Sequence, residues 1–179
     1  VNVTTGGTYT VTITNSSNEC TATATTTVIE NKTIPSVTAS NNGPLTCTKT
    51  SVTLSATPTT GVTYLWSNSA VTQSINITTP GTYTVTITAA NGCTGTATTI
   101  VTQDITQPNA IASNDGPITC AKNSVTLSAQ PTTGVTYNWS NNATTQSVNV
   151  TTGGTYTVTI TNSSNGCTAT ATTIVTQDI

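Results

Sequence analysis

Hydrophobic and polar residues alternate in an eight-residue stretch, Gly-Thr-Tyr-Thr-Val-Thr-Ile-Thr, that occurs at residues 7–14, 81–88 and 154–161. Successive side chains of a β-strand point to opposite faces, so the Tyr, Val and Ile of each copy share one face and the Thr side chains share the other. These residue types are also those that suit a pleated, half-buried surface. The pattern therefore predicts a half-buried strand in all three copies.

The alternating stretch belongs to a longer repeat with a period of about 73 residues. Trp66 recurs as Trp139, and Cys47 recurs as Cys120. Because the first 34 residues match the end of the chain, we expect a window cut from a longer array. The expected domains are the C-terminal part of a repeat at residues 1–34 and complete repeats at residues 35–107 and 108–179.

Within residues 35–107, short alternating segments are separated by turn-forming clusters such as Asn-Asn-Gly-Pro and Asn-Gly. Short strands with frequent turns indicate an all-β fold of tandem immunoglobulin-like β-sandwich repeats, arranged as beads on a string. The expected strands cover residues 37–40, 51–56, 62–66, 73–77, 81–88 and 93–101, and residues 103–107 are expected to be a linker.

The few aromatic residues have defined places in such a sandwich. Trp66 and Trp139 fall on the third strand of their repeats, and Tyr83 and Tyr156 fall at the start of the penultimate strand, where a tyrosine corner is expected. We expect these four residues to anchor the cores. A chain of such low complexity would also suit disorder, but the strict alternation and the regular Trp, Tyr and Cys positions favour a packed core.

Charged residues make up 4% of the chain, and its formal net charge is −2. This composition leaves no basic surface for nucleic acid and no polybasic patch for a membrane. No apolar run is long enough to span a bilayer. We therefore expect no nucleic-acid partner and no membrane span in this segment.

Candidate catalytic chemistry is sparse. No His is present to activate a Ser or to ligate zinc, and general acid–base catalysis needs two positioned groups. Lys49 and Lys122 occupy equivalent turns, but an isopeptide crosslink would need a buried acid, and none is evident. We expect no enzyme, no cofactor, and no catalytic or metal-binding residue, because the carboxylates fall singly near turns or linkers at Glu19, Glu30, Asp104, Asp115 and Asp178.

Six short motifs stand out in the two complete repeats: Tyr64-Leu-Trp-Ser-Asn68, Gln73-Ser-Ile75, Gly81-Thr-Tyr-Thr-Val-Thr-Ile87, Asn91-Gly-Cys-Thr94, Tyr137-Asn-Trp-Ser-Asn141 and Asn165-Gly-Cys-Thr168. With these motifs, both repeats resemble the SprB-type and PKD-like immunoglobulin-fold repeats of large secreted surface proteins of Bacteroidota. The resemblance implies a secreted or surface-anchored protein, such as an adhesin or filament of many tandem domains. The acidic run that usually follows the Trp of PKD domains is absent here, so no calcium or ligand site is implied.

The five cysteines are of two kinds: Cys20, Cys93 and Cys167 follow a hairpin turn, whereas Cys47 and Cys120 precede a second strand. In an extracellular chain this pattern favours disulfides. The topology that the resemblance implies puts the two kinds at opposite ends of one sandwich, too far apart to pair. It implies a bond between Cys47 and Cys167 of successive repeats, with Cys93 and Cys120 pairing outside the chain. The alternatives are bonds within repeats, Cys47 with Cys93 and Cys120 with Cys167, or free buried thiols.

Glycosylation is a further possibility for a surface with so few charges, and Asn2, Asn76 and Asn149 are candidate sites. Each begins an Asn-x-Ser/Thr sequence, but in a chain rich in Asn and Thr such sequences arise by chance. The others begin at Asn15, Asn31, Asn138, Asn142 and Asn162.

The sequence favours a structural role: a repeat segment of a secreted or surface-anchored filament or adhesin that forms a stiff, disulfide-stapled stalk at the cell surface. The expected partners are other copies of the same repeat, in the same chain or in neighbouring chains of a filament. Two alternatives remain open. One is a glycan- or protein-binding module, and the other is an inert spacer of a larger secreted enzyme.

Overall fold

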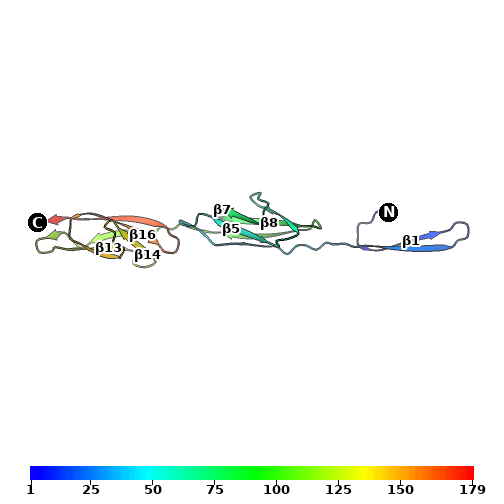
Figure 1. The fold of residues 1–179 in the computed structure, drawn as a ribbon, viewed down its shortest axis with the longest axis horizontal. Coiled ribbons are helices and arrows are strands. Elements are labelled where there is room, and N and C mark those ends of the chain that lie inside the picture. Colours follow the sequence, from blue (N-terminus) through cyan, green and yellow to red (C-terminus); the bar gives the residue numbers. More distant parts are fainter. The chain divides into compact units, whose positions relative to one another are not determined.

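A computed structural model describes all residues from 1 to 179, and the chain is all-β (Figure 1). It contains no helix that is long and apolar enough to cross a membrane. The strands are β1 (Gly7–Thr14), β2 (Thr21–Val28), β3 (Thr38–Asn41), β4 (Leu45–Thr46), β5 (Val52–Thr57), β6 (Val62–Trp66), β7 (Ser74–Ile77), β8 (Gly81–Ala89), β9 (Thr94–Val101), β10 (Gln103–Asp104), β11 (Ile111–Asn114), β12 (Ile118–Thr119), β13 (Val125–Gln130), β14 (Val135–Trp139), β15 (Ser147–Val150), β16 (Gly154–Asn162), β17 (Thr168–Val175) and β18 (Gln177–Asp178).

Two compact units can be distinguished along the chain. The first consists of residues 1–38, 56–73 and 84–97, and the second consists of residues 39–55, 74–83 and 98–179. The repeat boundaries expected after residues 34 and 107 stay a prediction.

The last sandwich in the chain has two antiparallel sheets, with strand orders β11-β13-β15 and β14-β16-β17. In the first sheet Val125 lies opposite Val150, and in the second Trp139 lies opposite Val158. Because apolar residues alternate along these strands, each sheet presents one apolar face, and the two faces together form the core. The core cluster consists of Ile118, Val125, Leu127, Ala129, Trp139, Val150, Val158, Ile160 and Val175.

The strands from β3 to β9 repeat this order, as sheets β3-β5-β7 and β6-β8-β9. The alternation expected from the sequence is visible in the burial of β5, where Val52, Leu54 and Ala56 are buried, and in the middle of β8, where Val85 and Ile87 are buried. The buried hydrophobic residues of this segment are Leu45, Val52, Leu54, Ala56, Trp66, Ile75, Ile77, Val85, Ile87 and Val101.

The aromatic side chains occupy the places typical of an immunoglobulin-like sandwich. Trp66 and Trp139 are each 1% exposed, and the Nε1 of Trp139 donates a hydrogen bond to the carbonyl oxygen of Thr145 at 3.0 Å. Tyr83 and Tyr156 are half-buried. The Tyr156 hydroxyl donates to the carbonyl oxygen of Thr152 at 2.9 Å, four residues upstream, which is the geometry of a tyrosine corner. The sandwiches are therefore immunoglobulin-like.

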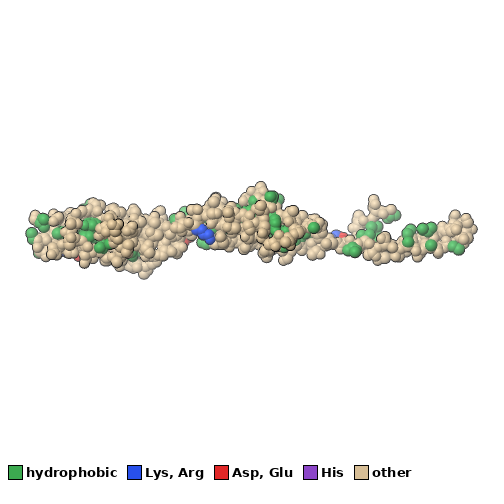
Figure 2. Space-filling model, viewed as in Figure 1, with side chains coloured by type: hydrophobic (Ala, Val, Ile, Leu, Met, Phe, Trp, Pro, Cys, Tyr) green, Lys and Arg blue, Asp and Glu red, His purple; other side chains and the backbone are tan.

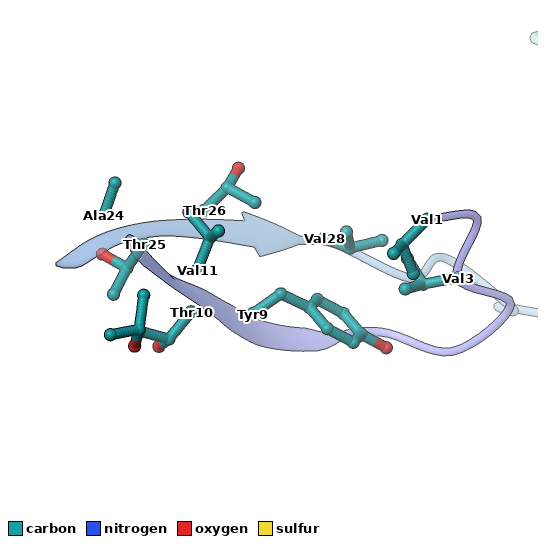
Figure 3. A pocket seen from close by; sticks show the side chains of 10 residues that line it. Val1, Val3, Tyr9, Thr10, Val11, Ala24, Thr25, Thr26 and Val28 are labelled. Carbon is teal, nitrogen blue, oxygen red and sulfur yellow. The ribbon is translucent and has the colours of Figure 1, made fainter. Parts of the chain in front are cut away.

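The hairpin of β1 and β2 has the same sequence pattern but a different environment. Its strands pair over their full length, yet Val11 is 55% and Ile13 65% exposed, whereas the equivalent Val158 and Ile160 are completely buried. Figure 2 shows hydrophobic side chains at the surface of the hairpin. A hollow of about 630 Å³ lies beside them, and in Figure 3 Tyr9 and Val28 line it together with residues near the N-terminus. The apolar face has no second sheet above it.

The sequence pattern missed the four shortest strands. Residues 103–107 were expected to be a linker, but β10 pairs in parallel with β4, and β18 pairs in the same way with β12. Two-residue strands are too short for alternation to be detected. Their pairing depends on the closure of the sandwich, which brings residues that are distant in sequence together.

We predict that Trp139→Ala destabilises the last sandwich by about 3–5 kcal/mol, because the loss of a fully buried indole leaves a cavity. Native-state hydrogen exchange of amides in β13 and β16 measures this loss. Ile174→Ala is the control: its side chain is 65% exposed, so its effect should stay within about 0.5 kcal/mol. Equal protection in both variants would show that Trp139 does not anchor the core.

Candidate functional site

A disulfide bond joins Cys47 to Cys167, two residues separated by 120 positions in the sequence. Their Cα atoms are 5.0 Å apart, within the usual range for disulfides. Here we define the joint as this bond together with Thr48, Asp104 and Thr106 on the Cys47 side and Asn165 and Gly166 on the Cys167 side. The joint is the candidate functional site, and it lies within the second compact unit.

The Cys167 side of the joint is a hairpin tip closed by backbone hydrogen bonds. The amide of Asn162 donates to the carbonyl oxygen of Cys167 at 2.8 Å, and the amide of Gly166 donates to that of Asn162 at 2.8 Å. Gly166 has a φ of +70°, in the left-handed region that glycine adopts at low cost. The Asn165 Oδ1 accepts from the amide of Cys167 at 2.9 Å, which fixes the cysteine at the start of its strand.

The Cys47 side is a tight turn held by β4 and β10. The parallel pairing places Asp104 beside Thr46. The amide of Thr46 donates to the carbonyl oxygen of Lys49 at 2.9 Å, and the amide of Lys49 donates to the Thr46 Oγ1 at 2.9 Å. These bonds hold Cys47 at the head of the turn, facing away from the sandwich core.

The Asn165 amide connects the two sides. This side chain is 2% exposed, and its Nδ2 donates to the Asp104 Oδ1 at 2.9 Å and to the carbonyl oxygen of Thr106 at 2.9 Å. With its Oδ1 bonded to Cys167, the amide has partners for all its polar atoms, as a buried amide requires. Hydrogen bonds from Asn165, and then from the backbone and side chain of Thr106, hold the pKa of Asp104 below its ordinary value of 3.8.

Gly166 lies so close to Thr48 that a side chain at position 166 has no room. A Cβ atom added at Gly166 would lie 2.4 Å from the Thr48 Cγ2 and 2.9 Å from its Oγ1. Carbon atoms in contact are normally about 3.5–4.0 Å apart. While Thr48 keeps its place, only glycine fits at this position of the tip.

A related set of hydrogen bonds occurs in the first compact unit. The Asn91 Nδ2 donates to the carbonyl oxygens of Asn31 and Thr33 at 3.3 and 3.0 Å, and the Asn91 Oδ1 accepts from the amide of Cys93 at 3.0 Å. Sequence reasoning missed the role of these asparagines. The available signal was an Asn two residues before each hairpin Cys, at Asn18, Asn91 and Asn165.

The remaining sequence candidates lie apart from the joint. Of the two pairing schemes weighed from the sequence, the structure contains the bond between Cys47 and Cys167 and none within a repeat. Cys20 and Cys120 are exposed free thiols and Cys93 is a half-buried one. The candidate glycosylation sites Asn2, Asn76 and Asn149 are exposed.

No protein-family model and no curated protein sequence matches the chain. Among solved structures, it is similar to three N-terminal domains of the bacteriophage RB49 highly immunogenic outer capsid protein, with a TM-score of 0.47 and 19% identity over 79% of this chain and 58% of that one. It is also similar to a 1.5-MDa bacterial ice-binding adhesin, with a TM-score of 0.47 and 15% identity over 96% of this chain and 74% of that one. A third similar structure is murine CEACAM1b, with a TM-score of 0.39 and 14% identity over 80% of this chain and all of that one. The chain spans less than two thirds of the capsid protein structure, and scores and identities this low carry no argument about function.

We predict that Asn165→Ala raises the pKa of Asp104 toward 3.8, because the largest cause of its lowering is the Asn165 hydrogen bond. A lowered pKa in the folded state means that this interaction stabilises the joint above the ordinary pKa and is lost as the pH falls through the lower, folded value. NMR titration of the Asp104 carboxyl carbon measures the shift.

Two controls accompany this titration. The pKa of Asp115, lowered by the Thr126 amide and by Lys122, should stay lowered in Asn165→Ala. Asn91→Ala, which removes the related asparagine of the first unit, should leave the pKa of Asp104 unchanged. An Asp104 pKa that is the same in Asn165→Ala and in the unmodified chain would contradict the role assigned to this hydrogen bond.

Proposed function

We propose that this chain is a structural repeat segment of a secreted or surface-anchored filament or adhesin, in which disulfide-stapled sandwiches carry tension. The observation that supports this proposal is the Cys47–Cys167 bond, which joins residues 120 positions apart in the chain. A bond of this span is of little use for positioning a reactive group, but it changes how force passes along the chain.

Tension follows the shortest covalent path between the points where a chain is pulled. A pull that enters before Cys47 and leaves after Cys167 crosses the disulfide and bypasses residues 48–166. These bypassed residues include all of β5–β9 and β11–β16. They cannot extend while the bond holds, even if their sandwiches unfold. The segment therefore keeps a nearly fixed length under load, which a stalk requires.

The disulfide also supports an extracellular or cell-surface location. Disulfides persist in oxidising compartments and are rare where thiols are kept reduced. A bond partly open to solvent, with Cys47 exposed, would be accessible to reductants in the cytosol.

The proposed partners are other copies of the same repeat. Tips with an Asn-x-Cys sequence occur three times in the chain, and turns of the Cys47 kind occur twice. Such surfaces suit successive repeats in one chain, or neighbouring chains of a filament.

We predict that a single chain stretched from its two termini in optical tweezers releases roughly 400 Å less contour length when oxidised than when reduced, because 119 residues lie between Cys47 and Cys167 and each extends by about 3.3–3.6 Å. Cys47→Ser without reductant should behave like the reduced chain. Equal release from the oxidised and reduced chains would overturn the proposal that this bond limits extension.

A further inference from the structure

The turn that carries Cys120 repeats the backbone and Thr–Lys hydrogen bonds of the turn that carries Cys47. The amide of Thr119 donates to the carbonyl oxygen of Lys122 at 2.9 Å, and the amide of Lys122 donates to the Thr119 Oγ1 at 3.0 Å. The parallel pairing of β12 with β18 places Asp178 beside Thr119, as Asp104 lies beside Thr46 in the joint. Cys120 is therefore held as Cys47 is held, but its thiol is free and exposed.

The tip that carries Cys20 likewise repeats the tip that carries Cys167. The amide of Asn15 donates to the carbonyl oxygen of Cys20 at 2.8 Å, and the amide of Glu19 donates to that of Asn15 at 2.8 Å. The Asn18 Oδ1 accepts from the amide of Cys20 at 3.2 Å. The Cys93 tip, by contrast, is one residue shorter: Cys93 follows Gly81 by 12 positions, whereas Cys20 follows Gly7 and Cys167 follows Gly154 by 13 positions. Of the two free tips, the Cys20 tip thus matches the bonded one in length and hydrogen bonding.

The tip residues 15–20 differ from residues 162–167 at one position, and the turn residues 119–122 differ from residues 46–49 at one position. In the joint, the residues at these two positions, Gly166 and Thr48, contact each other. Glu19, with a φ of +56°, replaces Gly166 in the tip. Ala121 replaces Thr48 in the turn. Both atoms that a Cβ at Gly166 would strike hardest, the Cγ2 and Oγ1 of Thr48, are missing from alanine. The remaining contact would be with the Cβ atom, at 3.2 Å in the joint, which a small shift relieves.

The two substitutions are therefore complementary. The Cβ of a tip with Glu19 would clash with the Thr48 side chain, whereas a turn with Ala121 lacks the two atoms responsible for that clash. Steric exclusion of this kind selects one partner over a similar one without adding affinity.

We propose that Cys120 is a covalent attachment site for a second copy of this chain, whose tip Asn18-Glu19-Cys20 occupies the turn of Cys120 as Asn165-Gly166-Cys167 occupies that of Cys47. The Asn18 amide then donates to the carboxylate of Asp178. This inference rests on the proposed function, because it names which copies of the repeat join and through which residues.

The bond forms by thiol–disulfide exchange with a small-molecule disulfide such as oxidised glutathione. The Cys120 thiolate attacks the glutathione disulfide and releases one glutathione thiolate. The Cys20 thiolate then attacks the protein sulfur of this mixed disulfide and releases the second. The two cysteines lose two protons and two electrons, and one glutathione disulfide becomes two glutathione molecules.

The test uses residues 1–179 carrying Cys93→Ser, incubated with oxidised and reduced glutathione and digested with trypsin without reduction. Cleavage after Lys32, Lys49 and Lys122 separates the cysteines into fragments 1–32, 33–49, 50–122 and 123–179. The expected product is an oligomer in which fragment 1–32 is bonded to fragment 50–122. A majority of bonds between two identical fragments, or the Cys20–Cys120 bond found only within monomers, would overturn the proposal.

Two further variants test the steric selection. Ala121→Thr restores the turn sequence of the joint and should lower the yield of the Cys20–Cys120 bond about tenfold, because Glu19 no longer fits. Glu19→Gly combined with Ala121→Thr should recover that yield. The bond between fragments 33–49 and 123–179 reports that each variant is folded. Equal yields with and without Ala121→Thr would refute the selection, whatever the tweezers show for the Cys47–Cys167 bond.

Discussion

The apolar row of an alternating strand is only half of a core, and the structure depends on the second sheet that covers it. Three copies of the same eight residues show this dependence directly. In β16 the second sheet is present, and Val158 and Ile160 are fully buried. In β1 it is absent, and Val11 and Ile13 are more than half exposed. Burying a Val or Ile side chain contributes about 1.5–3 kcal/mol, so closure of the two sheets stabilises each sandwich, whereas strand pairing alone leaves its apolar face in water.

In the joint, too, each side depends on the other, because the tip and the turn are held together by bonds that neither makes alone. No large apolar surface is involved. A covalent bond, one buried amide and the close approach of the Gly166 backbone to the Thr48 side chain fix Cys167 against Cys47. Because the Asn165 amide is bonded on both sides, neither the tip nor the turn satisfies its polar atoms alone. The disulfide determines that the two segments stay together, and Asn165 with Gly166 determines how they fit.

The sequence predicted the sandwich well, because Val85, Ile87 and their equivalents alternate strictly with Thr, and because Trp66 and Trp139 recur at fixed spacing. It could not predict β4 and β10, because each of these strands has only two residues and so shows no alternation. The resemblance favoured a bond between Cys47 and Cys167 but left pairing within repeats open, since spacing alone does not fix which cysteines meet. The sequence also did not reveal that Asn165 connects the two sides of the joint or that Thr48 lies against Gly166. A repeat comparison shows that Gly166 becomes Glu19 and that Thr48 becomes Ala121, but only coordinates show that these positions touch.

The joint contains few charges, and this determines how it responds to dissolved salt. Asp104 is its one ionisable side chain, and the partners of that carboxylate are neutral amide and hydroxyl groups. Dissolved ions weaken attractions between opposite charges over distances of about 10 Å at 0.1 M, but they have little effect on a short hydrogen bond from a neutral amide to a carboxylate or on a sulfur–sulfur bond. A connection built in this way keeps its geometry in fresh water and in brine alike, so a structure assembled from such segments would tolerate large changes in salinity.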